Sequence, residues 1–237
     1  MNLEYINVVG YVFEPIIQDR KKLRECLKDF GLSCNLKGTL LIAPEGINVT
    51  SVSGKSDQVW KFLDYLSQIT GISYERFDFK QSQCVDKPFS RFLVRLKKEI
   101  ISFDHTYQVE QQAPYVSGCE LDRMLEDRQD VVLLDTRNDY EIELGSFKNA
   151  IKPPIKTFKE FKSYVDSIEH LKDKKVVTFC TGGIRCEKAA TYLKRRGFSD
   201  VYQLHGGILR YFETTDAKNY DGECFVFDKR VSLKKDL

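Results

Sequence analysis

The sequence of 237 residues lacks the features of several common classes of protein. No apolar run approaches the roughly 20 residues that a membrane-spanning helix needs. The first residues, MNLEYINVVGYVFEP, include an acidic side chain but no basic leader and no small-residue cleavage site, which does not favour a secretory signal peptide. We therefore expect a cytoplasmic protein without a membrane partner.

Histidine and cysteine are also sparse. Three histidines leave few histidine-based mechanisms, and no repeated Cys-x-x-Cys or Cys/His cluster indicates a zinc site. The seven cysteines are odd in number and spread unevenly, which argues against a disulfide framework and favours a reducing compartment. We predict free thiols and no metal.

What is present is a globular composition, with 42% hydrophobic and 30% charged residues. The formal net charge of +2 is too small to indicate nucleic acid by itself. Its distribution is uneven, because residues 1–100 hold 15 Lys and Arg against 12 Asp and Glu. Such an excess of basic residues forms either a solvated face or a binding surface.

Hydrophobic periodicity divides the chain into two domains. Residues 1–100 give the order β-α-β-β-α-β, which predicts a ferredoxin-like, acylphosphatase-like α+β domain. The expected strands and helices cover residues 5–13, 17–31, 37–54 (two strands with a turn at 44–46), 56–71, 72–80 and 91–100. We read residues 101–118 as a linker.

In the second half, apolar strands at 131–137, 174–180 and 200–207 alternate with helical segments at 157–173 and 185–197. Continuous apolar strands that alternate with helices predict an α/β domain with a doubly wound parallel sheet covered on both faces. We assign this domain to residues 119–215 and a C-terminal tail to residues 216–237.

The stretch VVTFCTGGIRCEKAA places Cys180 at the end of an apolar strand and a helix shortly after it. Parallel α/β sheets bind ligands at this edge. The glycines of the loop let backbone N–H groups turn toward the sulfur, and the helix N-terminus and Arg185 add positive charge, all of which favours a thiolate. A buried structural cysteine in a plain turn is the alternative. The active loop would comprise Thr181, Gly182, Gly183 and Ile184.

This second half resembles a rhodanese domain, through LLDTRNDYE, GSFKNAI, CTGGIRCEKAA and VYQLHGGILRY. The resemblance implies that Asp135 and Arg137 support the site from the preceding strand end. Ser146 stands where many rhodaneses have a histidine that is a structural partner. Four residues separate Cys180 from Arg185, one fewer than in related phosphatases, which argues against phosphoester hydrolysis.

Adding KGTLLIAPEGINVT and GECFVFDKRV extends the likeness over nearly the whole chain, which resembles the rhodanese-domain tRNA uridine hydroxylases. That resemblance implies conversion of the wobble uridine in the tRNA anticodon to 5-hydroxyuridine, with Cys180 in the active site and molecular oxygen as co-substrate. No metal or flavin motif is evident, so no further cofactor is predicted. Many relatives continue into a cysteine-rich tail, whereas this sequence ends at Leu237.

Two other functions stay open from the residues alone. A sulfurtransferase would carry a persulfide on Cys180, and a binding module would use the loop without catalysis. The N-terminal domain favours the RNA enzyme, because a bare sulfur carrier does not need it. Cys186 and Cys224 are each either a resolving thiol for Cys180 or a small buried residue.

An RNA substrate predicts a positive surface that leads to Cys180. The candidates for phosphate contact are the basic residues before the linker and those on the helix after the loop: Lys80, Lys87, Arg91, Arg95, Lys97, Lys98, Lys188, Arg195 and Arg196. The sequence does not determine the oligomeric state.

Overall fold

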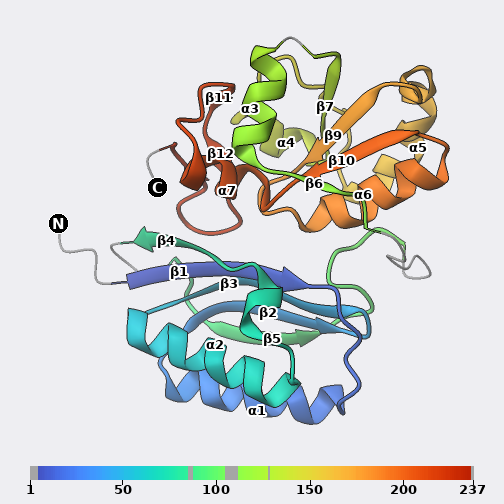
Figure 1. The fold of residues 1–237 in the computed structure, drawn as a ribbon. Helices are drawn as coiled ribbons and strands as arrows, with labels where there is room; N and C mark the ends of the chain where they lie inside the picture. The colour runs from blue at the N-terminus through green and yellow to red at the C-terminus, as the bar shows by residue number, and fades with distance from the viewer. Residues whose placement is uncertain (1–4, 85–87, 105–111, 128, 236–237) are drawn as a thin grey trace. The chain divides into compact units, whose positions relative to one another are not determined.

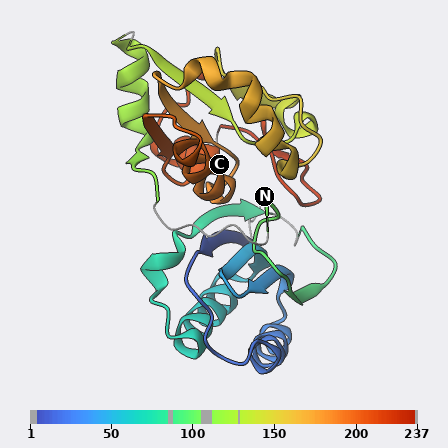
Figure 2. The same ribbon diagram turned by 90° about the vertical axis from the view of Figure 1, so that its right-hand side faces the viewer.

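The computed structural model describes residues 5–84, 88–104, 112–127 and 129–235. The chain forms two compact units, Met1–Ile101 with Asp228–Arg230, and Ser102–Phe227 with Val231–Leu237. Each unit has its own sheet and helices (Figures 1 and 2).

The N-terminal unit is a five-stranded sheet in the order β4-β1-β3-β2-β5. Its first four strands have the arrangement expected of a ferredoxin-like domain, which confirms the predicted fold. β5 is an addition that pairs parallel to β2 at the edge of the sheet. The strands are β1 (Tyr5–Val12), β2 (Lys37–Ala43), β3 (Gly46–Gly54), β4 (Lys80–Cys84) and β5 (Phe92–Leu96).

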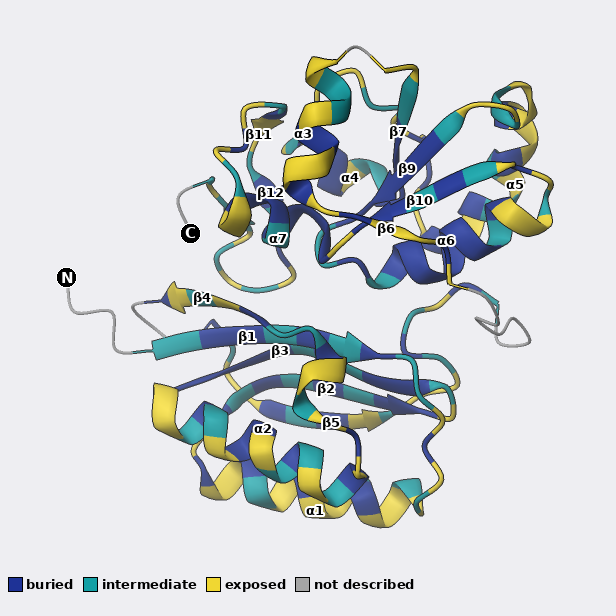
Figure 3. Ribbon diagram, in the orientation of Figure 1, coloured by how far each residue is buried: buried dark blue, intermediate teal, exposed yellow. Residues whose placement is uncertain are grey.

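Two helices, α1 (Arg20–Ser33) and α2 (Ser56–Thr70), cover one face of this sheet (Figure 1). α1 begins after Asp19, whose carboxylate accepts hydrogen bonds from two N–H groups of the first turn and so caps the helix. α2 buries Val59, Phe62 and Leu66 at helical spacing, and its opposite side is exposed (Figure 3). Burial of these faces forms the core of the unit.

One predicted strand of this unit is wrong. Residues 72–80 form a short 3-10 helix, Tyr74–Phe77, and the edge strand β4 begins only at Lys80. The aromatic residues of this segment pack in a turn, where the ring centroids of Phe77 and Phe79 lie 5.1 Å apart in a stacked arrangement. Asp78 between them has a left-handed backbone, which ends the helix and lets β4 start.

The C-terminal unit contains a parallel sheet in the order β6-β10-β9-β7, as the sequence predicted for this half. Its strands are β6 (Tyr115–Val116), β7 (Val131–Asp135), β9 (Lys175–Phe179) and β10 (Asp200–Leu204). Helices α3 (Gly118–Glu126) and α7 (Gly207–Thr214) pack together on one side, and α6 (Ile184–Arg195) packs on β9 and β10 from the other (Figure 1).

The segment 157–173, predicted to be one helix, is broken into three pieces. These are the 3-10 helices Phe158–Glu160 and Val165–Leu171 and the short α5 (Phe161–Tyr164). Phe158, Phe161, Val165 and Ile168 are all buried. Most of these residues are three apart, and a 3-10 helix places such residues on one side.

The unit boundaries also differ from the predicted linker and tail. Within the predicted linker, Phe103 is buried and its ring lies 5.0 Å from that of Phe158, and β6 joins the parallel sheet. Within the predicted tail, β11 (Tyr220–Gly222) pairs with β8 (Gly145–Phe147), and β12 (Cys224–Phe225) pairs with β13 (Ser232–Leu233). Most of the tail therefore belongs to the C-terminal unit.

Candidate active site

The Cys180 side chain lies directly after β9, in the loop that leads into α6. The N–H of Gly183 donates a hydrogen bond to its sulfur over 3.1 Å, and the thiol is buried. Gly183 has a φ of 96°, a conformation that side-chain-bearing residues rarely adopt. A glycine at this position therefore lets the backbone turn its N–H inward, as the sequence predicted.

The surroundings of Cys180 lower the pKa of its thiol to about 6. Burial alone would raise that pKa, but a hydrogen bond from the Cys186 thiol, the charge of Arg185, and the N–H groups of Arg185 and Gly183 outweigh it. Burial and the neighbouring sulfur raise the pKa of Cys186 well above its usual value. At neutral pH, Cys186 is therefore a protonated donor and Cys180 a thiolate.

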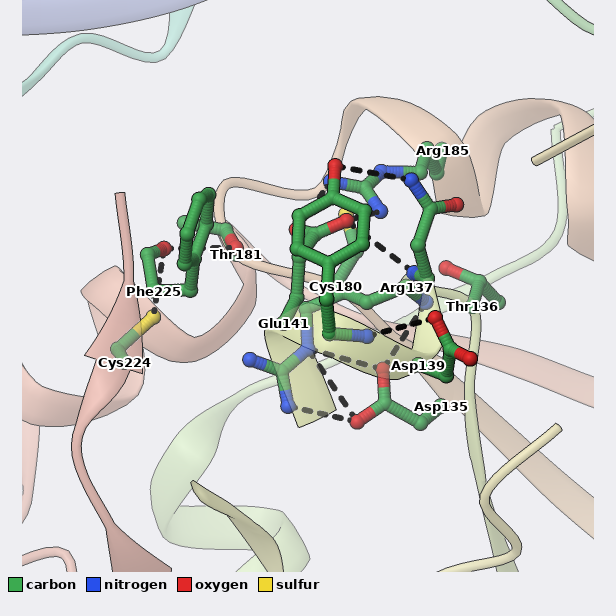
Figure 4. Close-up of polar contacts among 12 residues, drawn as sticks. Asp135, Thr136, Arg137, Asp139, Glu141, Cys180, Thr181, Arg185, Cys224 and Phe225 are labelled. Atoms are coloured by element: carbon green, nitrogen blue, oxygen red, sulfur yellow. Dashed lines mark hydrogen bonds and ion pairs between the residues drawn. The ribbon is translucent and has the colours of Figure 1, made fainter. Parts of the chain in front are cut away.

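Arg185 is held by a carboxylate rather than pointing freely into solvent. Its two terminal nitrogens donate to the two carboxylate oxygens of Glu141 at 2.6 and 2.7 Å, and both side chains are buried (Figure 4). Glu141 lies on α4 (Asp139–Ile142), the helical turn after β7. This two-point contact fixes the plane of the guanidinium and compensates its charge.

A second buried ion pair supports the loop after β7. Arg137 donates to Asp135 through Nε and Nη2, with the Nη2–Oδ2 distance 2.7 Å, and also to the carbonyl of Gly145 (Figure 4). The hydroxyl of Ser146 donates to the same carboxylate over 2.8 Å. Ser146 therefore acts as a structural partner at the position where many rhodaneses have histidine.

Gly207 is a site residue whose role the sequence indicated only as part of a closing turn. A Cβ there would lie 2.4 Å from the carbonyl oxygen of Cys180, and the φ of 65° also favours glycine. The next N–H, that of Ile208, donates to this same carbonyl over 2.9 Å. The backbone of this turn thus packs directly against the backbone of the Cys180 loop.

Gly182 differs from the other two glycines, because an added Cβ would meet no atom within 4 Å. The fold itself does not require glycine there. Thr181 and Ile184 are partly exposed, and the Thr181 hydroxyl donates to the carbonyl of Phe225 over 3.3 Å. Burial raises the pKa of Cys224 to about 12, so this thiol is neutral and a weak nucleophile.

Comparison with known proteins matches each half of the chain to a family. The UPF0176 acylphosphatase-like domain matches residues 5–100, and the rhodanese-like domain matches residues 119–214. A tRNA uridine(34) hydroxylase of Teredinibacter turnerae is 43% identical over 243 residues, which cover 99% of this chain and 73% of the relative. The chain belongs to the tRNA uridine(34) hydroxylase family.

Solved structures align with part of this family member. A rhodanese-related protein of Thermoplasma volcanium is 26% identical and covers 42% of this chain and 91% of its own, with a TM-score of 0.36. A human single-domain sulfurtransferase is 23% identical and covers 44% and 98% of the two chains, with a TM-score of 0.38.

The predicted phosphate contacts of this family member fall into four groups. Lys80 and Lys188 are buried, and Lys80 forms an ion pair with Asp78, so neither ammonium is placed to meet a phosphate. Arg196 is occupied by Asp166 and Glu169. Lys87 lies outside the described residues, and the exposed candidates are Arg91, Arg95, Lys97, Lys98 and Arg195.

Among the described residues, no group of three or more His, Cys, Asp or Glu side chains is arranged to hold a metal ion. No helix within the same residues is long and apolar enough to cross a bilayer.

Proposed function

We propose that this protein converts the wobble uridine of tRNA to 5-hydroxyuridine, with dioxygen as the oxygen source and Cys180 as the nucleophile. Similarity over 99% of this chain, and 73% of the relative, to a protein named tRNA uridine(34) hydroxylase supports the reaction. One observation supports the assignment of Cys180 as the nucleophile. Its sulfur accepts a hydrogen bond from the Gly183 N–H, and its surroundings lower the thiol pKa to about 6. Such a thiol is ionised at neutral pH.

The proposed reaction begins with addition of the Cys180 thiolate to C6 of uracil. A carbon–sulfur bond forms, and the electron pair of the C5–C6 double bond moves onto C5 and O4. C5 then takes up dioxygen to give a peroxide anion, which takes a proton from solvent and becomes a hydroperoxide. An external two-electron reductant, such as a pair of thiols that become a disulfide, cleaves the O–O bond and leaves C5–OH and water.

The final step restores the base and the enzyme. Loss of the C5 proton and departure of the Cys180 sulfur reform the C5–C6 double bond. A thiol of low pKa is a good leaving group, so the contacts that favour the thiolate assist this step as well as the first. The N–H of Gly183 and the thiol of Cys186 would stabilise the sulfur in both.

A sulfurtransferase would also use a thiolate at this position, through a persulfide on Cys180. The deciding experiment is mass analysis of tRNA nucleosides from cells that lack the gene and carry wild type, Cys180→Ser or Cys119→Ser. Cys119 is an exposed thiol and provides the matched control. We expect 5-hydroxyuridine with wild type and Cys119→Ser, and none with Cys180→Ser.

Growth under isotopically heavy oxygen gas tests the oxygen source. The label should appear in the C5 hydroxyl of the nucleoside, because the oxygen comes from dioxygen and not from water. Unlabelled hydroxyl would refute the dioxygen step. Loss of thiolated nucleosides in place of 5-hydroxyuridine in the Cys180→Ser cells would favour the sulfurtransferase.

A further inference from the structure

Three aromatic rings lie in series on α4 and around β12. The ring centroids of Tyr140 and Phe225 are 5.4 Å apart, and those of Phe225 and Phe227 are 5.0 Å apart, each pair edge to face. Tyr140 is 42% exposed and Phe227 is 51% exposed, which is unusual for large aromatic side chains. We call Tyr140, Phe225 and Phe227 the aromatic ledge.

The aromatic ledge is attached directly to the Cys180 loop. The guanidinium carbon of Arg185 lies 5.8 Å from the ring centroid of Phe227. The Thr181 hydroxyl donates to the carbonyl of Phe225, and Figure 4 shows this contact beside Cys180. α4 carries both Tyr140 of the ledge and Glu141, the partner of Arg185. The aromatic ledge and the Cys180 loop are therefore adjacent and share contacts.

The chemistry of this surface suits a flat neutral group better than an anion. The Arg185 guanidinium is already paired with Glu141 at two points, so it has little charge to offer a phosphate. Exposed aromatic faces bind the bases of single-stranded RNA loops by stacking. Contiguous exposed apolar surface on a folded protein is a common mark of an interaction site.

We propose that the aromatic ledge stacks a nucleobase of the tRNA anticodon loop, either the target uridine or its neighbour, and so positions the target at Cys180. This inference rests on the proposed function, because it assumes an RNA substrate. Phe227 is the main stacking residue since it is the most exposed of the three and lies nearest Arg185. Tyr140 extends the surface.

The test uses the full chain and an anticodon stem-loop RNA that carries the fluorescent base 2-aminopurine. The probe is placed at the target position and at each flanking position in turn, and stacking is read as quenching on binding. The quenched position identifies the base that the ledge holds. We expect Phe227→Ala to weaken binding by about 5- to 150-fold, the loss of one base–aromatic stack.

Substitutions of different shape separate stacking from simple apolar contact. Phe227→Trp should restore binding and quenching, whereas Phe227→Leu should behave like the alanine variant. Leu144→Ala is the matched control, because Leu144 is an exposed apolar residue just after α4 that has no π face. Equal losses for Phe227→Ala and Leu144→Ala, or full binding by Phe227→Leu, would refute stacking and favour a protein partner on this face.

Two further readouts separate this inference from the proposed function. Reaction of Cys180 with a small disulfide in the absence of RNA should be the same in wild type and Phe227→Ala, which shows that the loop is intact. If wild type forms 5-hydroxyuridine and Phe227→Ala retains both RNA binding and turnover, the stacking role of the aromatic ledge is refuted and the proposed function is unaffected. If wild type forms none, the proposed function itself fails.

Discussion

Removal of one sulfur–sulfur hydrogen bond should shift the ionisation of Cys180. Cys186→Ala deletes the thiol that donates to the Cys180 sulfur, whereas Cys186→Ser keeps a donor of similar size. Cys186 is fully buried in the first turn of α6, so water does not readily replace the lost donor. The alanine variant should therefore stabilise the thiolate less than wild type does.

The size of the effect follows from the energy of a charged hydrogen bond. Such a bond contributes about 1.5–3 kcal/mol, and 1.36 kcal/mol corresponds to one pH unit, so the pKa of Cys180 should rise by roughly 1–2. Starting from about 6, the variant would ionise between about 7 and 8. At pH 6 the thiolate fraction would fall from about one half to between about 10% and 1%.

Rates respond less than ionisation does, because a more basic thiolate is also more nucleophilic. With a Brønsted coefficient of about 0.45, the net rate at pH 6 should drop only about 2- to 6-fold. The pH at which the rate levels off is therefore the sharper measure. It should lie near 6 in wild type and about 1–2 pH units higher in Cys186→Ala.

The assay follows reaction of Cys180 with a small disulfide between pH 4.5 and 9, by mass analysis of the peptide that contains it. A small reagent is needed because Cys180 is only 1% exposed. Cys186→Ser should retain most of the wild-type profile. An unchanged profile in Cys186→Ala, or a wild-type profile that levels off near the free-thiol value of about 8.5, would refute this account of the site.

Three other changes test the loop, its support and the basic surface. Gly207→Ala should lower hydroxylation on the order of 100-fold in a tRNA nucleoside assay, because its Cβ displaces the Cys180 loop, whereas Gly182→Ala meets open space and should not disturb the Cys180 pH profile. Retained activity in Gly207→Ala would contradict the conclusion that the close packing of Gly207 positions the Cys180 loop. Ser146→Ala should lower the free energy of unfolding, measured in urea, by about 1.5–3 kcal/mol, because the buried Asp135 carboxylate loses one hydrogen bond. An unchanged free energy would show that water replaces the hydroxyl. Joint substitution of the exposed Arg95 and Lys97 by alanine should reduce the salt dependence of tRNA affinity by a slope of up to about 1.8; an unaltered slope would identify a solvated face.

The sequence predicted the class of both units and the ferredoxin-like arrangement of four N-terminal strands. It did not predict the pairing of β5 or the strand order of the C-terminal unit. Parallel strands such as β9 are continuous apolar runs, so a local signal located them. The start of α1 was missed, because the helix was expected from residue 17 and begins at Arg20, after the Asp19 cap. The strand predicted over residues 72–80 was wrong because most of this segment packs around a 3-10 helix, Tyr74–Phe77. β5 was recognised as a strand, but its parallel pairing with β2 depends on contacts distant in sequence.

The site followed the same pattern. Cys180, Gly183 and Arg185 lie within one short motif, CTGGIR, so the sequence indicated their roles together. The partner of Arg185 is Glu141, 44 positions away, and the geometry that neutralises the arginine emerges only from the fold. Lys188 illustrates the converse error, because positive charge in a sequence does not reveal that the side chain is buried.

The balance of charge around Cys180 favours a neutral substrate. Arg185 is compensated by Glu141 and Arg137 by Asp135, so ionisation of Cys180 leaves this buried group with a formal charge of −1. A phosphate brought to the sulfur would meet repulsion from the thiolate and from carboxylates that already occupy the two arginines. In the proposed reaction, uracil brings no charge, and addition of the thiolate to C6 would move the negative charge from sulfur to the base without changing the total. The site that stabilises the free thiolate therefore needs no additional charge to hold the adduct, which is the electrostatic condition for a thiol that must both add to a base and leave it.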